Sequence, residues 1–280
     1  MNPILRWAGG KRAISHILSQ CLPKSFGTYF EPMVGSGALF FSLAPKRAVL
    51  ADVNAELINF YRVIQNNPHE FYGEVQKLAA SKSRYYNVRA SCPSCSIDRA
   101  VRFFYLVRLS WNGLYRVNRQ GQFNVPFGGR CPQELINFES VRAASRKLKK
   151  VHLISGDFET SMRKPRIGDF VYFDPPYPKG ATNGNGFARY SKIGFVTEDH
   201  KRLAHYASRM ADQGIHVLIT EAARREILKF FSACFYVTLV KTSSMIAAAG
   251  ERRGSTYEAI LTSYRTSPIR EIDDLRKRTT

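Results

Sequence analysis

The chain has 280 residues and a large excess of basic side chains. Hydrophobic residues make up 44% of it, which is enough for a buried core and excludes a disordered or fibrous protein. Lysine and arginine number 42 against 22 aspartate and glutamate, a formal net charge of +20 that favours nucleic acid as the partner over a ribosome or a membrane surface. Because no apolar run approaches the ~20 residues of a membrane span and no signal peptide is recognisable, we expect a cytoplasmic protein.

The cysteines do not suggest a disulfide framework or a metal centre. They are odd in number and scattered along the chain, and Cys92-Pro-Ser-Cys95 is the only close pair. A structural zinc ion needs four ligands, and no second C-x-x-C follows. We therefore expect reduced thiols and no metal. The five are Cys21, Cys92, Cys95, Cys131 and Cys234.

The amino-terminal part reads as alternating strands and helices. Residues 28–34 are apolar and β-rich, and run through Gly35-Ser-Gly37 into a helix-compatible segment at 38–43. A second short apolar strand is predicted over 47–52, followed by a helical pattern over 55–65. This is a βαβα opening.

Strand and helix signals of the same kind return late in the chain. Strands are predicted over 151–155, 169–173 and 216–220, with a helix over 197–213. The alternation predicts an α/β fold whose mostly parallel sheet is covered on both faces.

The middle of the chain differs in composition from both ends. Residues 56–149 are helical in pattern, rich in arginine and tyrosine, and contain a turn-dense segment at about 112–129. We predict an inserted domain there, with residues 1–55 and 150–268 forming one catalytic domain. Residues 269–280 form a highly charged tail that we expect to fray.

The tetrapeptide Asp174-Pro-Pro-Tyr177 directly follows the predicted strand 169–173. Open α/β sheets place their active sites at the carboxyl ends of strands. Asp174 and the Pro175 carbonyl can accept the two hydrogens of an exocyclic amine, which directs the nitrogen at an electrophilic methyl group. Tyr177 offers a face for a flipped base, and neither metal nor covalent intermediate is required. A strand-ending turn is the alternative for the tetrapeptide alone.

The segment Glu31-Pro-Met-Val-Gly35-Ser-Gly37 has the composition of a cofactor loop, because glycines let a backbone pass close to a ligand. Asp52 ends the next predicted strand, where an acid can accept hydrogen bonds from ribose hydroxyls; the alternative is an N-cap of the following helix. The loop lacks the G-x-G-x-x-G pattern. A cofactor without phosphates, such as S-adenosylmethionine, fits better than NAD.

The amino-terminal Leu5-Arg6-Trp7-Ala8-Gly9-Gly10-Lys11 superficially resembles a Walker loop. The G-x-x-x-x-G-K-S/T spacing is absent and no strand precedes it, which argues against ATP. Lys11 could meet a cofactor carboxylate, with Trp7 packing beside the cofactor. The alternative is a surface lysine and a core tryptophan.

Taken in order, these motifs resemble the Dam-type (class D12, alpha-group) DNA adenine-N6 methyltransferases. The resemblance spans nearly the whole chain and rests on Arg6-Trp-Ala-Gly-Gly-Lys11, Phe30-Glu-Pro-Met-Val-Gly-Ser-Gly37, Ala51-Asp-Val-Asn54 and Asp174-Pro-Pro-Tyr177. The family's target-recognition hairpin is similar to Trp111-Asn-Gly-Leu-Tyr-Arg116 and Gly121-Gln-Phe-Asn-Val-Pro-Phe-Gly128. Tyr190 and Gly194-Phe-Val-Thr197 match positions after the catalytic loop.

The resemblance implies a Rossmann-like class I S-adenosylmethionine-dependent methyltransferase fold, with a mostly parallel sheet and an inserted helical target-recognition domain (56–149) that carries a β-hairpin. It implies S-adenosylmethionine as the methyl donor, S-adenosylhomocysteine as the product, and no metal. Catalysis would fall to Asp174, Pro175, Pro176 and Tyr177. The cofactor residues would be Trp7, Ala8, Gly9, Lys11, Glu31, Pro32, Gly35, Ser36, Gly37, Asp52, Asp157, Phe158 and Asp174.

The resemblance also implies double-stranded DNA as the partner. The residues expected at the groove or beside the orphaned base are Arg6, Trp111, Asn112, Leu114, Arg116, Asn118, Arg119, Asn124, Arg130 and Tyr190. Arginine can read guanine and asparagine can read adenine. Phosphates could be neutralised by Arg108, Arg119, Arg130, Arg142, Arg146, Lys147, Lys149 and Lys150, although each could equally be a solvated surface side chain.

The chain departs from the family pattern at four positions. Arg6 stands where lysine is common and Trp111 where a smaller aromatic is expected, while Met33 and Ser36 vary the cofactor loop. The family's GATC target is therefore not transferred to this chain. The loop at residues 178–190 is expected to be mobile and to order over the flipped base.

Two other functions remain open from sequence. The amine-orienting motif would also serve an N4-cytosine or RNA N6-adenine methyltransferase, and the fold could belong to a non-catalytic DNA-binding protein. The target is expected to be short and palindromic, served by a monomer acting twice or by a homodimer in the bacterial cytoplasm.

Overall fold

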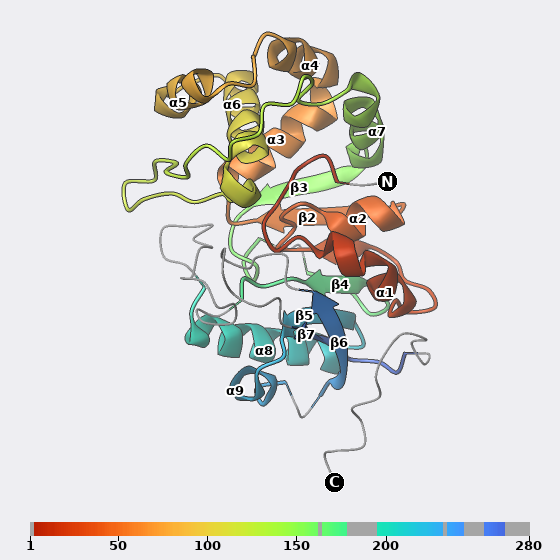
Figure 1. Ribbon diagram of the computed structural model, residues 1–280. Helices are drawn as coiled ribbons and strands as arrows, with labels where there is room; N and C mark the ends of the chain where they lie inside the picture. The colour runs from red at the N-terminus through yellow and green to blue at the C-terminus, as the bar shows by residue number, and fades with distance from the viewer. Residues whose placement is uncertain (1–2, 162–163, 178–194, 232–233, 244–254, 267–280) are drawn as a thin grey trace. The chain divides into compact units, whose positions relative to one another are not determined.

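The computed structural model describes residues 3–161, 164–177, 195–231, 234–243 and 255–266 (Figure 1). Its described residues fall into two compact units. The first unit comprises residues 3–12 and 32–161, and the second comprises residues 13–31, 164–177, 195–231, 234–243 and 255–266. The predicted loop 178–190 and the charged tail 269–280 lie outside the described residues.

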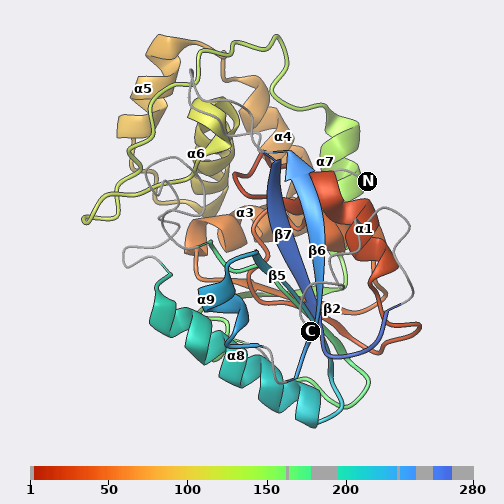
Figure 2. The same ribbon diagram turned by 60° about the horizontal axis from the view of Figure 1, so that its bottom comes forward.

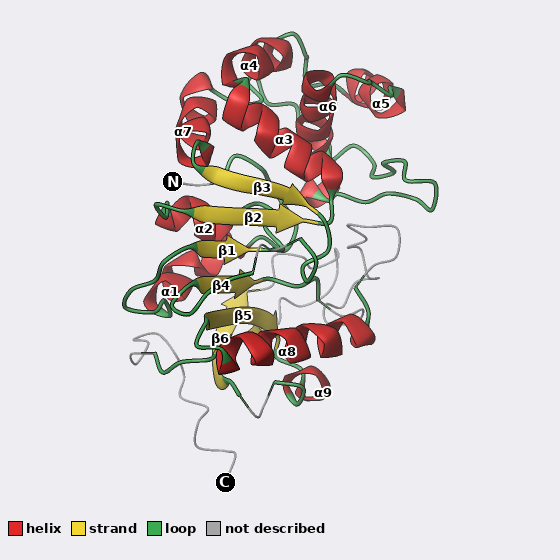
Figure 3. Ribbon diagram, turned by 180° about the vertical axis from the view of Figure 1, so that it is seen from behind, coloured by secondary structure: helices red, strands yellow, loops and turns green. Residues whose placement is uncertain are grey.

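The first unit contains two parallel strands, β2 (Ala48–Asp52) and β3 (Val151–Ser155). They pair in register from Ala48 opposite Val151 to Asp52 opposite Ser155. Helix α3 (Ala55–Asn66) packs against both strands, and Arg62 of this helix donates to the Leu153 carbonyl at 2.9 Å. Figure 3 shows β2 and β3 as adjacent arrows with α3 alongside. The predicted strands 47–52 and 151–155 and the helix 55–65 are confirmed.

Helices are the main secondary structure of the first unit. Besides the short α2 (Ala38–Leu43), it contains α4 (Pro68–Gln76), α5 (Lys82–Ala90), α6 (Ser96–Leu109), α7 (Phe138–Leu148) and the 3-10 turn η2 (Trp111–Gly113). Side-chain caps explain where the longer helices begin, since Asn54, Ser81, Cys95 and Asn137 each accept a backbone amide of the first turn. Stacked Phe60 and Phe104, with ring centroids 6.0 Å apart, join α3 to α6.

The second unit holds a five-stranded sheet in the order β1-β4-β5-β7-β6. Strands β1 (Tyr29–Glu31), β4 (Phe170–Phe173) and β5 (His216–Ala222) are parallel, and β7 (Ser255–Thr262) runs antiparallel to both β5 and β6 (Tyr236–Ser243). Helix α8 (Thr197–Asp212) leads into β5, and α9 (Arg225–Leu228) follows it. The antiparallel β6 and β7, side by side in Figure 2, are not among the elements predicted from sequence.

Two short helical elements precede β1 in the chain, the 3-10 helix η1 (Lys11–Ile14) and the helix α1 (Ser15–Gln20). Strand β1 is shorter than the predicted 28–34, because Pro32 has no amide hydrogen to continue a ladder. The remaining predicted strands and the helix 197–213 are present, and the mostly parallel sheet with its helices confirms the α/β class. No helix among the described residues is both long and apolar enough to span a membrane.

Candidate active site

Asp174 begins the segment that leaves β4 at its carboxyl end, in the second unit. Its Oδ1 accepts a hydrogen bond of 2.9 Å from the hydroxyl of Thr220, a fully buried residue on the neighbouring strand β5. The Tyr172 hydroxyl lies 3.1 Å from the same Thr220 oxygen. Parallel pairing of β4 with β5 therefore fixes the orientation of the Asp174 carboxylate.

Tyr177, at the other end of the tetrapeptide, is hydrogen-bonded to β7, the strand between β5 and β6. Its hydroxyl donates to Glu258 on β7, which lies opposite Ala222 of β5. Burial, reinforced by the negative charges of Glu258 and Asp174, raises the pKa of Tyr177 well above its usual value. The phenol is therefore a neutral donor, and the bond fixes how its ring is presented.

Further carboxylates lie at the ends of neighbouring strands in the second unit. Glu31 ends β1 and accepts a hydrogen bond of 2.8 Å from Tyr29. Glu221 on β5 pairs with His200 of α8 at 2.9 Å, and both side chains are fully buried. Both carboxylates are therefore engaged by side chains of their own unit.

In the first unit, the glycine loop adopts backbone angles that L side chains rarely take. Gly35 has φ +47° and Gly37 has φ +65°. A Cβ on Gly35 would lie 3.0 Å from Nε1 of Trp7, and one on Gly10 would lie 2.9 Å from Oγ of Ser36. The loop at 35–37 and the segment around Trp7 are thus packed too closely for larger residues.

Asp52, at the carboxyl end of β2, organises that loop. It is 8% exposed, and its two oxygens accept from the Gly35 amide at 3.1 Å and the Asn54 amide at 2.9 Å. Burial raises its pKa to about 6, although both backbone hydrogen bonds oppose the shift. The N-cap of α3 is Asn54, whose Oδ1 accepts from the Glu56 and Leu57 amides, so the capping alternative for Asp52 is wrong.

The other predicted cofactor residues of the first unit lie on neighbouring loops. Lys11 is buried and its Nζ donates to the Gly9 carbonyl at 3.1 Å, so it is not a surface lysine. The Gly156 amide donates to the Asp52 carbonyl at 3.0 Å, which joins the end of β2 to the loop carrying Asp157 and the buried Phe158. The predicted cofactor residues of this unit are Trp7, Ala8, Gly9, Lys11, Pro32, Gly35, Ser36, Gly37, Asp52, Asp157 and Phe158.

The turn-dense segment forms an irregular hairpin, held by isolated bridges between Ser110 and Phe127 and between Val117 and Phe123. At its tip, Oδ1 of Asn118 accepts from the amides of Gln120 and Gln122, so this side chain shapes the turn. Across the hairpin, Nε of Arg116 donates to Oδ1 of Asn124 at 2.8 Å.

Of the aromatic and apolar residues predicted to contact DNA, Trp111 is 40% exposed, whereas Leu114 is buried. Asn112 lies in η2 at φ +53°, a left-handed conformation that asparagine tolerates. Tyr190 lies outside the described residues.

Three arginines of the first unit repel one another. Burial, and then Arg130 and Arg108, lower the pKa of Arg6, and burial with Arg130 lowers that of Arg108. In the part of the chain that the structure describes, none of the three forms an ion pair with a carboxylate. Such a cationic group is suited to a polyanion.

The other residues predicted to bind phosphates differ in whether their side chains are already bonded within the protein. Arg142 pairs with Glu139 at 2.7 Å, and Nζ of Lys147 donates to the Phe41 carbonyl at 2.7 Å. Arg142 is nevertheless exposed, as are Arg119, Arg146, Lys149 and Lys150.

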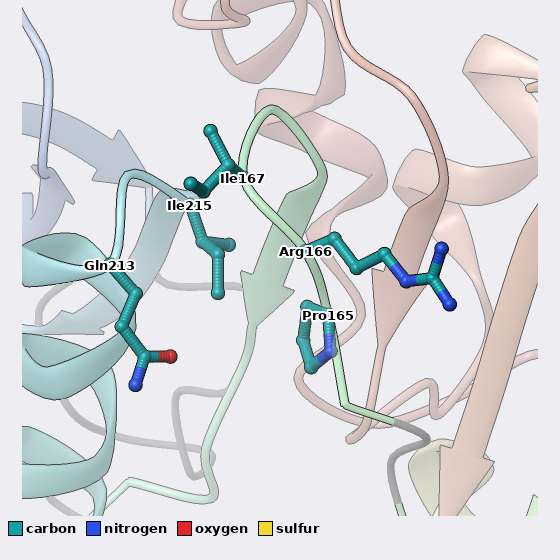
Figure 4. Close-up of a pocket in the computed structure, with 5 residues that line it drawn as sticks. All are labelled: Pro165, Arg166, Ile167, Gln213 and Ile215. Carbon is teal, nitrogen blue, oxygen red and sulfur yellow. The ribbon is translucent and has the colours of Figure 1, made fainter.

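A shallow pocket elsewhere in the second unit is not part of this arrangement (Figure 4). It is lined by Pro165, Arg166, Ile167, Gln213 and Ile215, which precede β4 and β5. These residues lie at the amino ends of the strands, opposite to the ends that carry Asp174 and Glu221.

Comparison with known proteins identifies the family. Residues 7–246 match the family model for D12 class N6 adenine-specific DNA methyltransferases. The type II methyltransferase M1.LlaDCHI of Lactococcus lactis is 34% identical over 94% of this chain and 96% of its own length. M.MjaIII of Methanocaldococcus jannaschii is 30% identical over 94% of this chain and 99% of its own length. The DNA adenine methylase of Vibrio cholerae is 28% identical over 91% of this chain and 94% of its own length.

The chain belongs to the D12 class of N6 adenine-specific DNA methyltransferases. Its mostly parallel sheet with flanking helices is an α/β fold, and the substrate of its family is DNA. Among solved structures, a precorrin-6y C5,15-methyltransferase from Geobacter metallireducens is similar at 10% identity and a TM-score of 0.38, covering 93% of this chain and 96% of its own. The fold assignment rests on the family and the strand pairing.

The structure adds residues to this methyltransferase's site that sequence reasoning missed. Thr220 ends the predicted strand 216–220, so the carboxyl-end rule that selected Asp174 could have found it. Glu258 carried no such signal, because β7 was not predicted.

Proposed function

We propose that this enzyme transfers the methyl group of S-adenosylmethionine to N6 of an adenine flipped out of a short, palindromic site in duplex DNA. The observation that carries the proposal is the Asp174-Pro-Pro-Tyr177 segment at the carboxyl end of β4, with Asp174 held by Thr220 and Tyr177 held by Glu258. It would act as a monomer or a homodimer in the bacterial cytoplasm.

The catalytic segment would act by orienting the adenine amine. Asp174 accepts one amine hydrogen and the Pro175 carbonyl accepts the other, which directs the nitrogen lone pair away from the ring plane and in line with the methyl carbon. Pro175 and Pro176 restrict the backbone so that the carbonyl is available, and Tyr177 provides the stacking face. The acceptor Oδ1 of Asp174 is pre-oriented by the Thr220 bond of 2.9 Å.

The first unit offers groups that fit S-adenosylmethionine. The left-handed Gly35 and Gly37 leave no side chain over the loop, Asp52 supplies a buried carboxylate for hydroxyls, and Lys11 a buried ammonium for a carboxylate. The bound cofactor supplies an electrophilic methyl group on a sulfonium. No group that requires a metal takes part in this scheme.

DNA would be bound through the hairpin and the basic side chains. Arg116 and Asn124, joined at 2.8 Å, present a paired donor and acceptor of the kind that reads base edges. Arg6, Arg108 and Arg130 supply unpaired positive charge for phosphates or guanine.

The test is to incubate the purified protein with methyl-labelled S-adenosylmethionine and unmethylated genomic DNA, followed by nucleoside mass spectrometry and methylation-sensitive sequencing. We expect label in N6-methyladenine within one sequence motif. Label in N4-methylcytosine or only in an RNA control would reassign the substrate, and the absence of label despite DNA binding would indicate a non-catalytic protein.

Asp174→Ala is the matched variant for this assay. We expect it to abolish methyl transfer, because one amine hydrogen loses its acceptor, and to leave DNA binding within about twofold of the unmodified protein because the basic surface is intact. Normal turnover by the variant would remove Asp174 from the catalytic scheme.

A further inference from the structure

Tyr115 lies in the recognition hairpin, one residue before Arg116, yet its side chain points into the first unit and is only 9% exposed. Its ring packs against Phe103 of α6, at a centroid distance of 5.3 Å, and against Phe123 on the returning arm, at 5.6 Å. Neither sequence reasoning nor the proposed function gives this tyrosine a role.

The third aromatic neighbour of Tyr115 is Trp7, from the predicted cofactor segment. Their ring centroids are 6.0 Å apart and the planes are inclined by only 18°, which is a stacked pair. Trp7 in turn contacts the glycine loop so closely that a Cβ on Gly35 would lie 3.0 Å from its Nε1. Tyr115, Trp7 and Gly35 therefore form one continuous contact from the hairpin to the loop.

The hydroxyl end of Tyr115 reaches toward the end of β2. Burial and the carboxylate of Glu56 raise the pKa of Tyr115 to about 12, and Asn54 and Asp52 are among the groups that act on it. Asn54 is itself buried, and its Oδ1 caps α3. Tyr115 thus stands beside the residues that hold the loop at 35–37.

We infer that Tyr115 is a positioning residue for the cofactor site, supplied by the recognition hairpin, and that it makes cofactor binding and target-duplex binding favour each other. The inference rests on the proposed function, since it assigns S-adenosylmethionine to the Trp7 and Gly35 side and DNA to the hairpin side. A duplex that fixes the hairpin fixes Tyr115, and so restricts Trp7. By linkage, a cofactor that fixes Trp7 strengthens duplex binding by the same factor.

The experiment measures the Kd of S-adenosylhomocysteine, which avoids turnover, by calorimetry with and without a target duplex. We expect Tyr115→Leu to weaken binding of the free enzyme by about twofold to tenfold, the range for losing one aromatic pair. The duplex should tighten binding at least about fivefold in the unmodified enzyme and not in the variant. Tyr115→Phe keeps the stacked ring and should restore both properties to within about twofold.

Trp7 provides a spectroscopic readout that a general loss of stability would not reproduce. The chain has only two tryptophans, so Trp111→Phe leaves Trp7 as the single reporter. In this background, Tyr115→Leu should shift Trp7 emission in the folded, ligand-free enzyme, whereas Tyr115→Phe should not. Tyr86→Leu is the matched control, because the Tyr86 ring meets Tyr85 edge to face, lies under the Arg89 guanidinium and is not among the partners of Trp7.

Tyr115→Met, which fills a similar volume without an aromatic face, replaces the leucine variant if that variant does not fold. The inference is overturned if the leucine or methionine variant binds S-adenosylhomocysteine like the unmodified enzyme, with the same gain from duplex DNA. The two proposals fail separately: an unmodified enzyme that transfers no methyl group to adenine refutes the proposed function, whereas normal transfer with an unaffected Tyr115 variant refutes only this inference.

Discussion

Asp52 shows how its surroundings decide what a carboxylate does. Its position after a strand predicts either a ribose contact or a helix cap, and the structure eliminates the cap because Asn54 occupies that role. Instead, both Asp52 oxygens hold backbone amides, one of them at the left-handed Gly35. A ribose contact would therefore share these oxygens with the loop, which carboxylates allow because each oxygen has two acceptor positions.

The raised pKa of Asp52 predicts a pH dependence of stability. Burial moves the pKa from 3.8 to about 6, so between these values the folded protein keeps a proton that the unfolded chain releases. The contribution of Asp52 to the free energy of unfolding therefore falls as the pH rises from about 4 to about 6. Asp52→Asn should lose this slope, measured as the difference between urea unfolding curves of the two proteins. If the free energies of unfolding of the two proteins changed in parallel with pH, Asp52 would not be the source of the pH dependence.

Among the secondary-structure elements, β7 is the one whose absence from the sequence prediction matters most for the site. It inserts between β5 and β6, and this pairing places Glu258 where the Tyr177 hydroxyl reaches it. A predicted parallel strand shows which residue lies at its carboxyl end. It does not show which residue of an antiparallel neighbouring strand will lie next to that end.

The Tyr177 and Glu258 bond predicts a coupled pair of variants. Glu258→Leu and Tyr177→Phe should each slow single-turnover methyl transfer about tenfold to a hundredfold, since a hydrogen bond to a charged group contributes ~1.5–3 kcal/mol. The double variant should be no slower than either single one, because both remove the same interaction. Cofactor affinity, measured in parallel, should stay within about twofold. Additive losses would show that the two side chains act independently.

Across the whole molecule, the basic side chains behind the formal net charge of +20 differ in their surroundings. Some are engaged locally, such as Lys147 on the Phe41 carbonyl and Arg142 on Glu139. Others, such as Arg6 and Arg108, lie close to like charges. The locally engaged side chains have less to gain from phosphates, so the charge excess overstates the number of DNA contacts.

This distinction predicts the salt dependence of DNA binding. With about six phosphate contacts, the association constant should fall about a thousandfold between 50 and 200 mM salt. Arg108→Ala should lower the slope of log K against log salt by about one, whereas Arg142→Ala should leave it unchanged. Fluorescence anisotropy with a labelled duplex gives both slopes, and equal slopes for the two variants would show that the local ion pair does not withhold Arg142.

The sequence by itself determined the alternation of strands and helices, the Asp174 to Tyr177 segment, the glycine loop and the basic charge, because each is written in neighbouring residues. Periodicity, turn glycines and charge are local properties of a chain. The tertiary structure alone decided that Thr220 orients Asp174, that Glu258 holds Tyr177 and that Tyr115 stacks on Trp7. These partners are 46, 81 and 108 positions apart, and only strand pairing and side-chain packing bring such distant residues together.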